Sequence, residues 1–230
     1  MDFINVAKEV FPSLLKGLKV TVQVTVISLA IALALGLVMC LMGRSEFKPL
    51  SLISKFYIWI IRGTPFIVQL FIIYFGIPQL VQSMGGSLRL SSFEAAVITL
   101  SLNAGAYISE IFRGGIQAVD PGQTEAARSL GMTKMSCMLK VVLPQAFRIS
   151  IPSLCNQFII TLKDTSLAQC IALAEIVYQG KMYVGRTMQS FNTYILIGMM
   201  YLFVITILSA LIRFTEKRLD YGNKNQSKSA

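Results

Sequence analysis

Long apolar runs, separated by short polar segments, make up most of this chain. A helix needs about 20 mostly apolar residues to cross the hydrocarbon core of a bilayer. Runs of that length cover approximately residues 20–42, 53–80, 92–112, 141–162 and 194–212. The pattern therefore predicts an all-α integral membrane protein with about five transmembrane helices.

The remaining segments are too short to form a second domain. We expect one transmembrane domain over residues 20–218, an extracytoplasmic or interfacial segment at 1–19, and a cytoplasmic tail at 219–230. The first apolar run is longer than the roughly 7–15 residues of a signal peptide, and no small-x-small cleavage site closes it. It is therefore expected to remain as the first membrane-spanning helix.

Two segments interrupt this regular pattern. In the second apolar run, Arg62-Gly63-Thr64-Pro65 places an arginine at membrane depth, close to a proline that removes a helical hydrogen bond. We expect a kinked span whose break faces protein or water. Residues 167–177 are apolar but too short to cross the membrane, and they contain Glu175. They predict a partly buried or re-entrant helix.

Composition agrees with a lipid environment and excludes several functions. Only 14% of the residues are charged and 54% are hydrophobic, whereas soluble domains are about 25% charged. The net charge is +10, but the basic residues flank apolar runs and form no patch among aromatics, so nucleic-acid binding is not expected. The absence of histidine excludes imidazole catalysis and imidazole metal sites. The four cysteines are far apart and are expected to be small buried hydrophobes.

The distribution of lysine and arginine predicts the orientation in the membrane. With the amino terminus outside, thirteen basic residues fall on the inner side and six on the outer side. Lys16 and Lys19, directly before the first span, favour the opposite orientation when taken alone. The sum over the chain predicts an extracytoplasmic amino terminus and a cytoplasmic carboxyl terminus.

The longest polar connection, residues 114–140, falls on the cytoplasmic side. Its centre predicts a short rigid helix at about 121–130, because Asp120 can cap it and Pro121 suits its first position. Gln123 would complete a capping box.

The same helix is expected to end in a left-handed residue and to carry a small apolar face. Gly131 suits the left-handed position. Ala126, Ala127 and Leu130 form a surface that can press into a groove on another protein.

These residues carry a resemblance to a known family. Glu125-Ala126-Ala127, Gly131 and Val141-Val142-Leu143-Pro144 resemble the E-A-A, G, I-x-L-P loop of the permease subunits of ATP-binding-cassette importers. Val141 stands where isoleucine is usual. Further segments resemble the polar amino-acid permease subfamily, and they are Leu15-Lys16-Gly17, Arg62-Gly63-Thr64-Pro65-Phe66-Ile67-Val68-Gln69-Leu70, Ala106-Tyr107-Ile108-Ser109-Glu110-Ile111-Phe112-Arg113-Gly114-Gly115-Ile116, Leu143-Pro144-Gln145-Ala146 and Lys163-Asp164-Thr165-Ser166-Leu167.

The resemblance implies the type I importer permease fold, as a multi-pass protein of the cytoplasmic (inner) membrane of a prokaryote. It also implies that the loop is a coupling helix for a separate ATPase. The residues expected to carry that coupling are Gln123, Glu125, Ala126, Ala127, Leu130 and Gly131. The implied partners are two ATPase subunits, a second permease half, an extracytoplasmic binding protein, the amino-acid substrate and membrane lipid. The second half can be another copy of this chain or a related chain.

The chain itself is not expected to be an enzyme. It has no G-x-x-x-x-G-K-[S/T] phosphate-binding loop, since the nearest candidate, Gly180-Lys181, is followed by Met182. ATP and magnesium are therefore assigned to the partner ATPase, and this chain is expected to bind no cofactor or metal.

Polar residues within or beside the spans are candidates for the substrate pathway, because charges there are costly. They are Arg62, Asn103, Glu110, Asn156, Gln157, Lys163, Asp164 and Thr165. An amino acid needs an acceptor for its ammonium group and donors for its carboxylate, and Asp164 with Lys163, Thr165 or Asn156 could supply both. Alternatively, Lys163-Asp164 only marks the end of a helix at the interface.

The other candidates also have structural alternatives. Glu110 can pair with Arg113 on one helix face or take part in gating. Arg62 can satisfy the carbonyls freed at the proline or steer a substrate carboxylate. Asn103 can simply join two helices.

Two other functions are weighed against the importer permease. A secondary transporter predicts inverted halves with matching broken helices, and the break near Pro65 has no counterpart. A membrane scaffold would leave the rigid helix at 121–130 as a generic docking site. Co-purification of a stoichiometric ATPase separates both alternatives from the permease.

Overall fold

The computed structural model describes residues 3–226, and side chains over residues 3–213. Within that range all regular elements are helical, which confirms the all-α prediction. The α-helices and the π- or 3-10 segments (η) are α1 Phe3–Gly43, α2 Lys48–Gly63, α3 Phe66–Phe71, η1 Ile72–Gly76, α4 Ile77–Ser83, α5 Ser92–Gln117, α6 Pro121–Ser129, α7 Lys134–Cys137, η2 Met138–Val142, α8 Leu143–Asp164, η3 Thr165–Ile171, α9 Ile176–Thr187 and α10 Ser190–Gln226.

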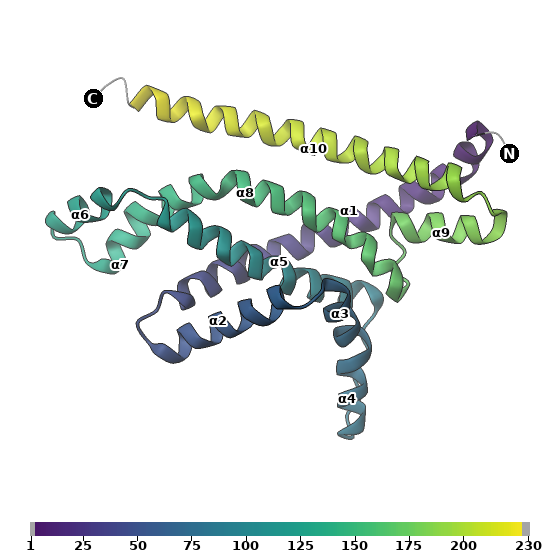
Figure 1. Ribbon diagram of the computed structural model, residues 1–230, viewed down its shortest axis with the longest axis horizontal. Coiled ribbons are helices and arrows are strands. Elements are labelled where there is room, and N and C mark those ends of the chain that lie inside the picture. Colours follow the sequence, from purple (N-terminus) through teal and green to yellow (C-terminus); the bar gives the residue numbers. More distant parts are fainter. Residues whose placement is uncertain (1–2, 227–230) are drawn as a thin grey trace.

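The long helices share one direction. Figure 1 shows α1, α5, α8 and α10 running along the long axis, whereas α3 and α4 point across it. The helices α6 and α7 lie at one end, and α9 lies at the other end beside the amino-terminal part of α1. In the described part of the chain, four segments are long and apolar enough to cross a membrane, namely Phe3–Gly43, Phe66–Ser83, Ser92–Gln117 and Ser190–Arg213. The more polar α8 is a further long helix with the same direction.

The two terminal helices are longer than the sequence predicts. α1 begins at Phe3, so the segment 1–19 is not separate from the first span as far as it is described. Val6 and Val10 in this part are buried against α9 and α10, which explains why the helix continues past the apolar run. α10 contains no proline and extends to Gln226, so most of the expected tail is helical, and residues 227–230 lie outside the described range.

The second apolar run forms two helical arms instead of one kinked span. α2 ends at Gly63, and Thr64 has extended backbone dihedrals (φ −123°, ψ 146°). Pro65 then precedes α3, where its missing N–H costs no helical hydrogen bond. The arm formed by α3, η1 and α4 leaves in a different direction from α2 (Figure 1).

Small residues allow α1 to pack closely against its neighbours. Ser28 on α1 donates a hydrogen bond to the Val97 carbonyl on α5 at 3.3 Å. A Cβ atom on Gly17 would lie 2.7 Å from the Cα of Ile176, at the start of α9, so only glycine fits there. Such contacts are typical of helix pairs in membranes, where small residues bring backbones together.

The segment between α8 and α9 is not a single re-entrant helix. It consists of η3 and a turn in which Ala172 is left-handed (φ 60°). Glu175 then caps α9, and its fully buried carboxylate accepts hydrogen bonds from Val177 N at 2.9 Å and Tyr178 N at 2.6 Å. These two bonds compensate part of the cost of burying the carboxyl group.

Candidate functional site

A glutamine closes the break between α2 and α3. The side-chain nitrogen of Gln69 donates to the carbonyl oxygens of Ile61 at 2.7 Å and Thr64 at 3.1 Å. Its side-chain oxygen accepts from Asn103 of α5 at 3.0 Å. The interpretation of Arg62 as the group that satisfies the freed carbonyls is therefore wrong, because Gln69 does so. Asn103 joins two helices through this bond, as the structural alternative for it predicts.

Three charged side chains form a cluster between α2 and α5. Arg62 lies 3.0 Å from the Glu110 carboxylate, and Arg113 lies 2.8 Å from the same oxygen. The Arg62 guanidinium also lies over the ring of Tyr107, 5.5 Å from its centroid. Glu110 thus makes the predicted pair with Arg113 and in addition holds Arg62.

Two adjoining cavities, of about 550 and 340 Å³, bring most of the predicted pathway residues together. Tyr107 and Gln157 line both cavities, so the two are neighbours. The predicted residues in the larger one are Arg62, Glu110, Asn156 and Gln157, and those in the smaller one are Asn103, Gln157 and Asp164. We call this pair of cavities the polar cavities.

Two predicted pathway residues lie outside the polar cavities. Lys163 is exposed and lines neither of them. Thr165 is fully buried, and its hydroxyl donates to the Leu162 carbonyl at 2.7 Å. The structure therefore does not bring either residue to Asp164 as a second ligand-binding group.

Sequence reasoning did not select Gln69 or Tyr107 as site residues. Both lie in the segments that carry the family resemblance, and Gln69 is a lone amide in an apolar run. That amide was a usable signal, because a polar side chain at membrane depth needs a partner. The role of Tyr107 depends on α2 and α8 lying beside α5, which no local pattern shows.

The connection between α5 and α8 contains the expected rigid helix, α6. The Asp120 side chain accepts a hydrogen bond from Gly122 N at 2.7 Å, and Pro121 occupies the first helical position. The predicted capping box is wrong, because the side-chain oxygen of Gln123 instead accepts from Gln145 of α8 at 3.3 Å. Gly131 has the left-handed conformation expected for it, with φ +82°.

The predicted apolar face of α6 is partly buried inside this chain and partly exposed. Ala127 is buried and packs inside this chain with residues such as Ile116 and Cys137, so it is not free to dock elsewhere. Ala126 and Glu125 are exposed, and Leu130 is 86% exposed. Of the three residues predicted to form the apolar face, Ala126 and Leu130 are therefore exposed and Ala127 is not.

α5 and α8, the helices on either side of the loop, touch closely near its ends. A Cβ atom on Gly115 of α5 would collide with the Ser150 hydroxyl and lie 2.7 Å from the Ala146 carbonyl oxygen. Ser150 in turn donates to the Ala146 carbonyl at 2.8 Å. The two helices thus contact each other beside the loop that connects them, and farther along they line the polar cavities.

Comparison with known proteins shows which proteins this chain is similar to. The family model for binding-protein-dependent transport system inner membrane components matches residues 32–221. The arginine transport system permease protein ArtQ of Bacillus subtilis (strain 168) is 36% identical over 208 residues, or 90% of this chain and 93% of that protein. The L-cystine transport system permease protein TcyB of the same organism is 39% identical over 216 residues, or 94% of this chain and 90% of that protein.

This chain is also similar to a solved structure. The crystal structure of an amino acid ABC transporter with histidines matches with a TM-score of 0.87 and 38% identity, covering 95% of this chain and 99% of that chain. The family match covers most of the chain, and the relatives align along nearly their full length. The chain therefore belongs to the family of binding-protein-dependent transport system inner membrane components.

Proposed function

We propose that this chain is the permease subunit of an ATP-binding-cassette importer that moves a polar amino acid across the cytoplasmic membrane. The observation that carries the proposal is the pair of polar cavities, in which two carboxylates and a guanidinium lie among amide side chains. Similar proteins include permeases of an arginine and an L-cystine transport system and an amino acid ABC transporter with histidines, and they support an amino acid as the cargo.

The chemistry of the polar cavities matches an amino-acid zwitterion. Asp164 lines the smaller cavity and can accept from the ammonium group, whereas Arg62 lines the larger one and can donate to the carboxylate. Arg62 is 44% exposed in its pair with Glu110, so its remaining N–H donors can reach a ligand. Asn103 and Gln157 add neutral hydrogen-bonding groups.

The proposed assembly assigns each face of the chain to one partner. Two ATPase subunits supply ATP hydrolysis, and one of them docks on Glu125, Ala126 and Leu130 of α6. A second permease half, whether another copy or a related chain, faces the polar cavities. A binding protein delivers the amino acid at the end that holds α9. The proposed orientation, with an extracytoplasmic amino terminus and five crossings including α8, follows from the distribution of basic residues.

Uptake by the reconstituted transporter tests the proposal. Proteoliposomes that contain the full chain, its ATPase and its binding protein should accumulate one polar amino acid from a labelled panel. Asp164→Asn should lower affinity about 10- to 150-fold, because a charged hydrogen bond contributes roughly 1.5–3 kcal/mol. Lys163→Gln, on the neighbouring exposed residue outside the polar cavities, is the matched control and should leave uptake unchanged.

Two results would contradict the proposal. Uptake of none of the amino acids by an assembled, ATP-hydrolysing complex would reject the substrate class. Equal uptake by Asp164→Asn and wild type would reject the assignment of the substrate to the polar cavities.

A further inference from the structure

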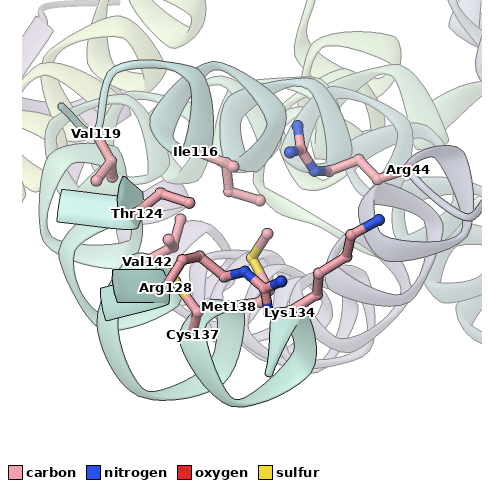
Figure 2. Close-up of a pocket in the computed structure, with 9 residues that line it drawn as sticks. All are labelled: Arg44, Ile116, Val119, Thr124, Arg128, Lys134, Cys137, Met138 and Val142. Carbon is pink, nitrogen blue, oxygen red and sulfur yellow. The ribbon is translucent and has the colours of Figure 1, made fainter. Parts of the chain in front are cut away.

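A basic cavity lies beside α6, at the end of the molecule that holds α6 and α7. It has a volume of about 370 Å³ and is lined by residues from the end of α1, the end of α5, α6, α7 and η2. Figure 2 shows Arg44 and Lys134 along one side of it, opposite Val119 and Val142. Arg128 contributes a third cationic group, and no carboxylate belongs to the described lining.

The positive charges of this basic cavity are largely uncompensated. Lys134 lies 3.0 Å from Glu46 at the rim, but the two side chains are 80% and 88% exposed, so this pair is weak. Arg128 uses one N–H to bond the Met132 carbonyl at 2.7 Å, which fixes its guanidinium and leaves its other donors available. Three cations around one hollow favour an anion with several acceptor oxygens, and a phosphate group fits that description.

An apolar groove adjoins the basic cavity on the membrane side. It has a volume of about 440 Å³, lies between α1, α5 and α8, and is lined by apolar side chains that include Leu37 and Phe147. Ile116 lines both hollows, so they are neighbours. About 10 Å of helix separate Leu37, in the groove, from Arg44, in the cavity. A molecule whose phosphate group lies in the cavity can therefore place an acyl chain in the groove.

We propose that the basic cavity and the apolar groove together form a binding site for an anionic phospholipid of the cytoplasmic leaflet. The phosphate group lies among Arg44, Arg128 and Lys134, and an acyl chain lies in the groove beside Leu37 and Ile116. Basic hollows at the inner ends of membrane helices bind anionic headgroups in this manner. A free phosphate uses only the cavity, and the apolar groove favours the lipid over it.

Lipid retention by the full chain, purified with its partner subunits, tests the site. Native mass spectrometry after exchange into equal amounts of phosphatidylglycerol and phosphatidylcholine should show preferential retention of phosphatidylglycerol. The double variant Arg44→Gln/Lys134→Gln should lower its affinity about thirty-fold, from the contribution of two basic residues near a membrane surface. The matched control, Lys48→Gln/Lys55→Gln, removes the same charge from exposed residues outside the basic cavity and should retain the lipid.

A second pair of variants isolates the groove. Ala34 lines the groove and is exposed, so Ala34→Phe should fill the groove and lower phosphatidylglycerol retention without changing any charge. Ala210→Phe, on an exposed position of α10, is the control. Equal retention of the two lipids by wild type, or equal loss in test and control variants, would overturn the proposal. Binding of inorganic phosphate that is as tight as that of the lipid and insensitive to Ala34→Phe would assign the cavity to a soluble anion and overturn the lipid site.

Discussion

Leu130 is the position at which the proposed coupling to an ATPase can be tested without damaging the permease. Its side chain is 86% exposed at the end of α6, so its removal changes little inside this chain. If docking buries it fully, the contact contributes about 1.5–3 kcal/mol. Leu130→Ala should therefore weaken association with the ATPase about 10- to 150-fold. Titration of detergent-solubilised permease against the purified ATPase measures this directly.

Ala127 supplies the contrasting variant, because it lies on the same short helix but faces inward. Ala127→Trp would place a large ring in the packed interior near Ile116 and Cys137. It should lower the melting temperature of the permease itself, since overpacking costs about 1–3 kcal/mol. Leu130→Ala should leave the melting temperature unchanged. An ATPase that binds Leu130→Ala and wild type equally well would refute the docking surface formed by Glu125, Ala126 and Leu130.

Three further predictions concern the fold around the site. Gln69→Leu should lower the free energy of unfolding by about 1–3 kcal/mol, because it leaves carbonyl groups at the helix break unsatisfied. In thermal unfolding, Gln82→Leu on the exposed face of α4 should show no such loss. Gly115→Ala should lower the melting temperature because its Cβ would collide with α8, whereas Gly114→Ala, with no atom within 4 Å, should raise it slightly. Burial raises the pKa of Glu175, between η3 and α9, from 4.5 to about 7. Between these pH values the folded state therefore binds more protons than the unfolded state, so stability should fall as pH rises through that window. In Glu175→Gln, the melting temperature should decline less over the same pH range.

Local signals in the sequence were sufficient wherever local chemistry decides the structure. Pro121 and Gly131 set the start and end of α6, because proline fits the first helical turn and glycine fits a left-handed residue. A break near the end of α2 was also visible in the sequence, since Pro65 removes a helical hydrogen bond, although the sequence predicted one kinked span and not two separate arms. The direction of the arm after Pro65 was not, because it depends on packing against α5 and η3.

Two predictions for α6 were wrong because of contacts with other helices. The spacing of Ala126, Ala127 and Leu130 indicates one apolar face, but the spacing does not reveal that Ala127 packs into the interior of the same chain. Gln123 has the right position for a capping box, yet Gln145 of another helix binds its side chain instead. In both cases the outcome depends on a neighbour outside α6, which the spacing within the helix does not reveal.

The positions of α5 and α8 connect the two candidate sites mechanically. Both helices begin or end at the cytoplasmic loop, and both line the polar cavities, α5 through Tyr107 and α8 through Gln157. Gly115 lies about 12 Å along α5 from Tyr107, and its close approach to Ala146 leaves little room for the helices to slide past each other. We therefore expect a displacement of α6 to move α5 and α8 together, and with them both walls of the polar cavities. A looser contact at Gly115 would let the two helices move independently.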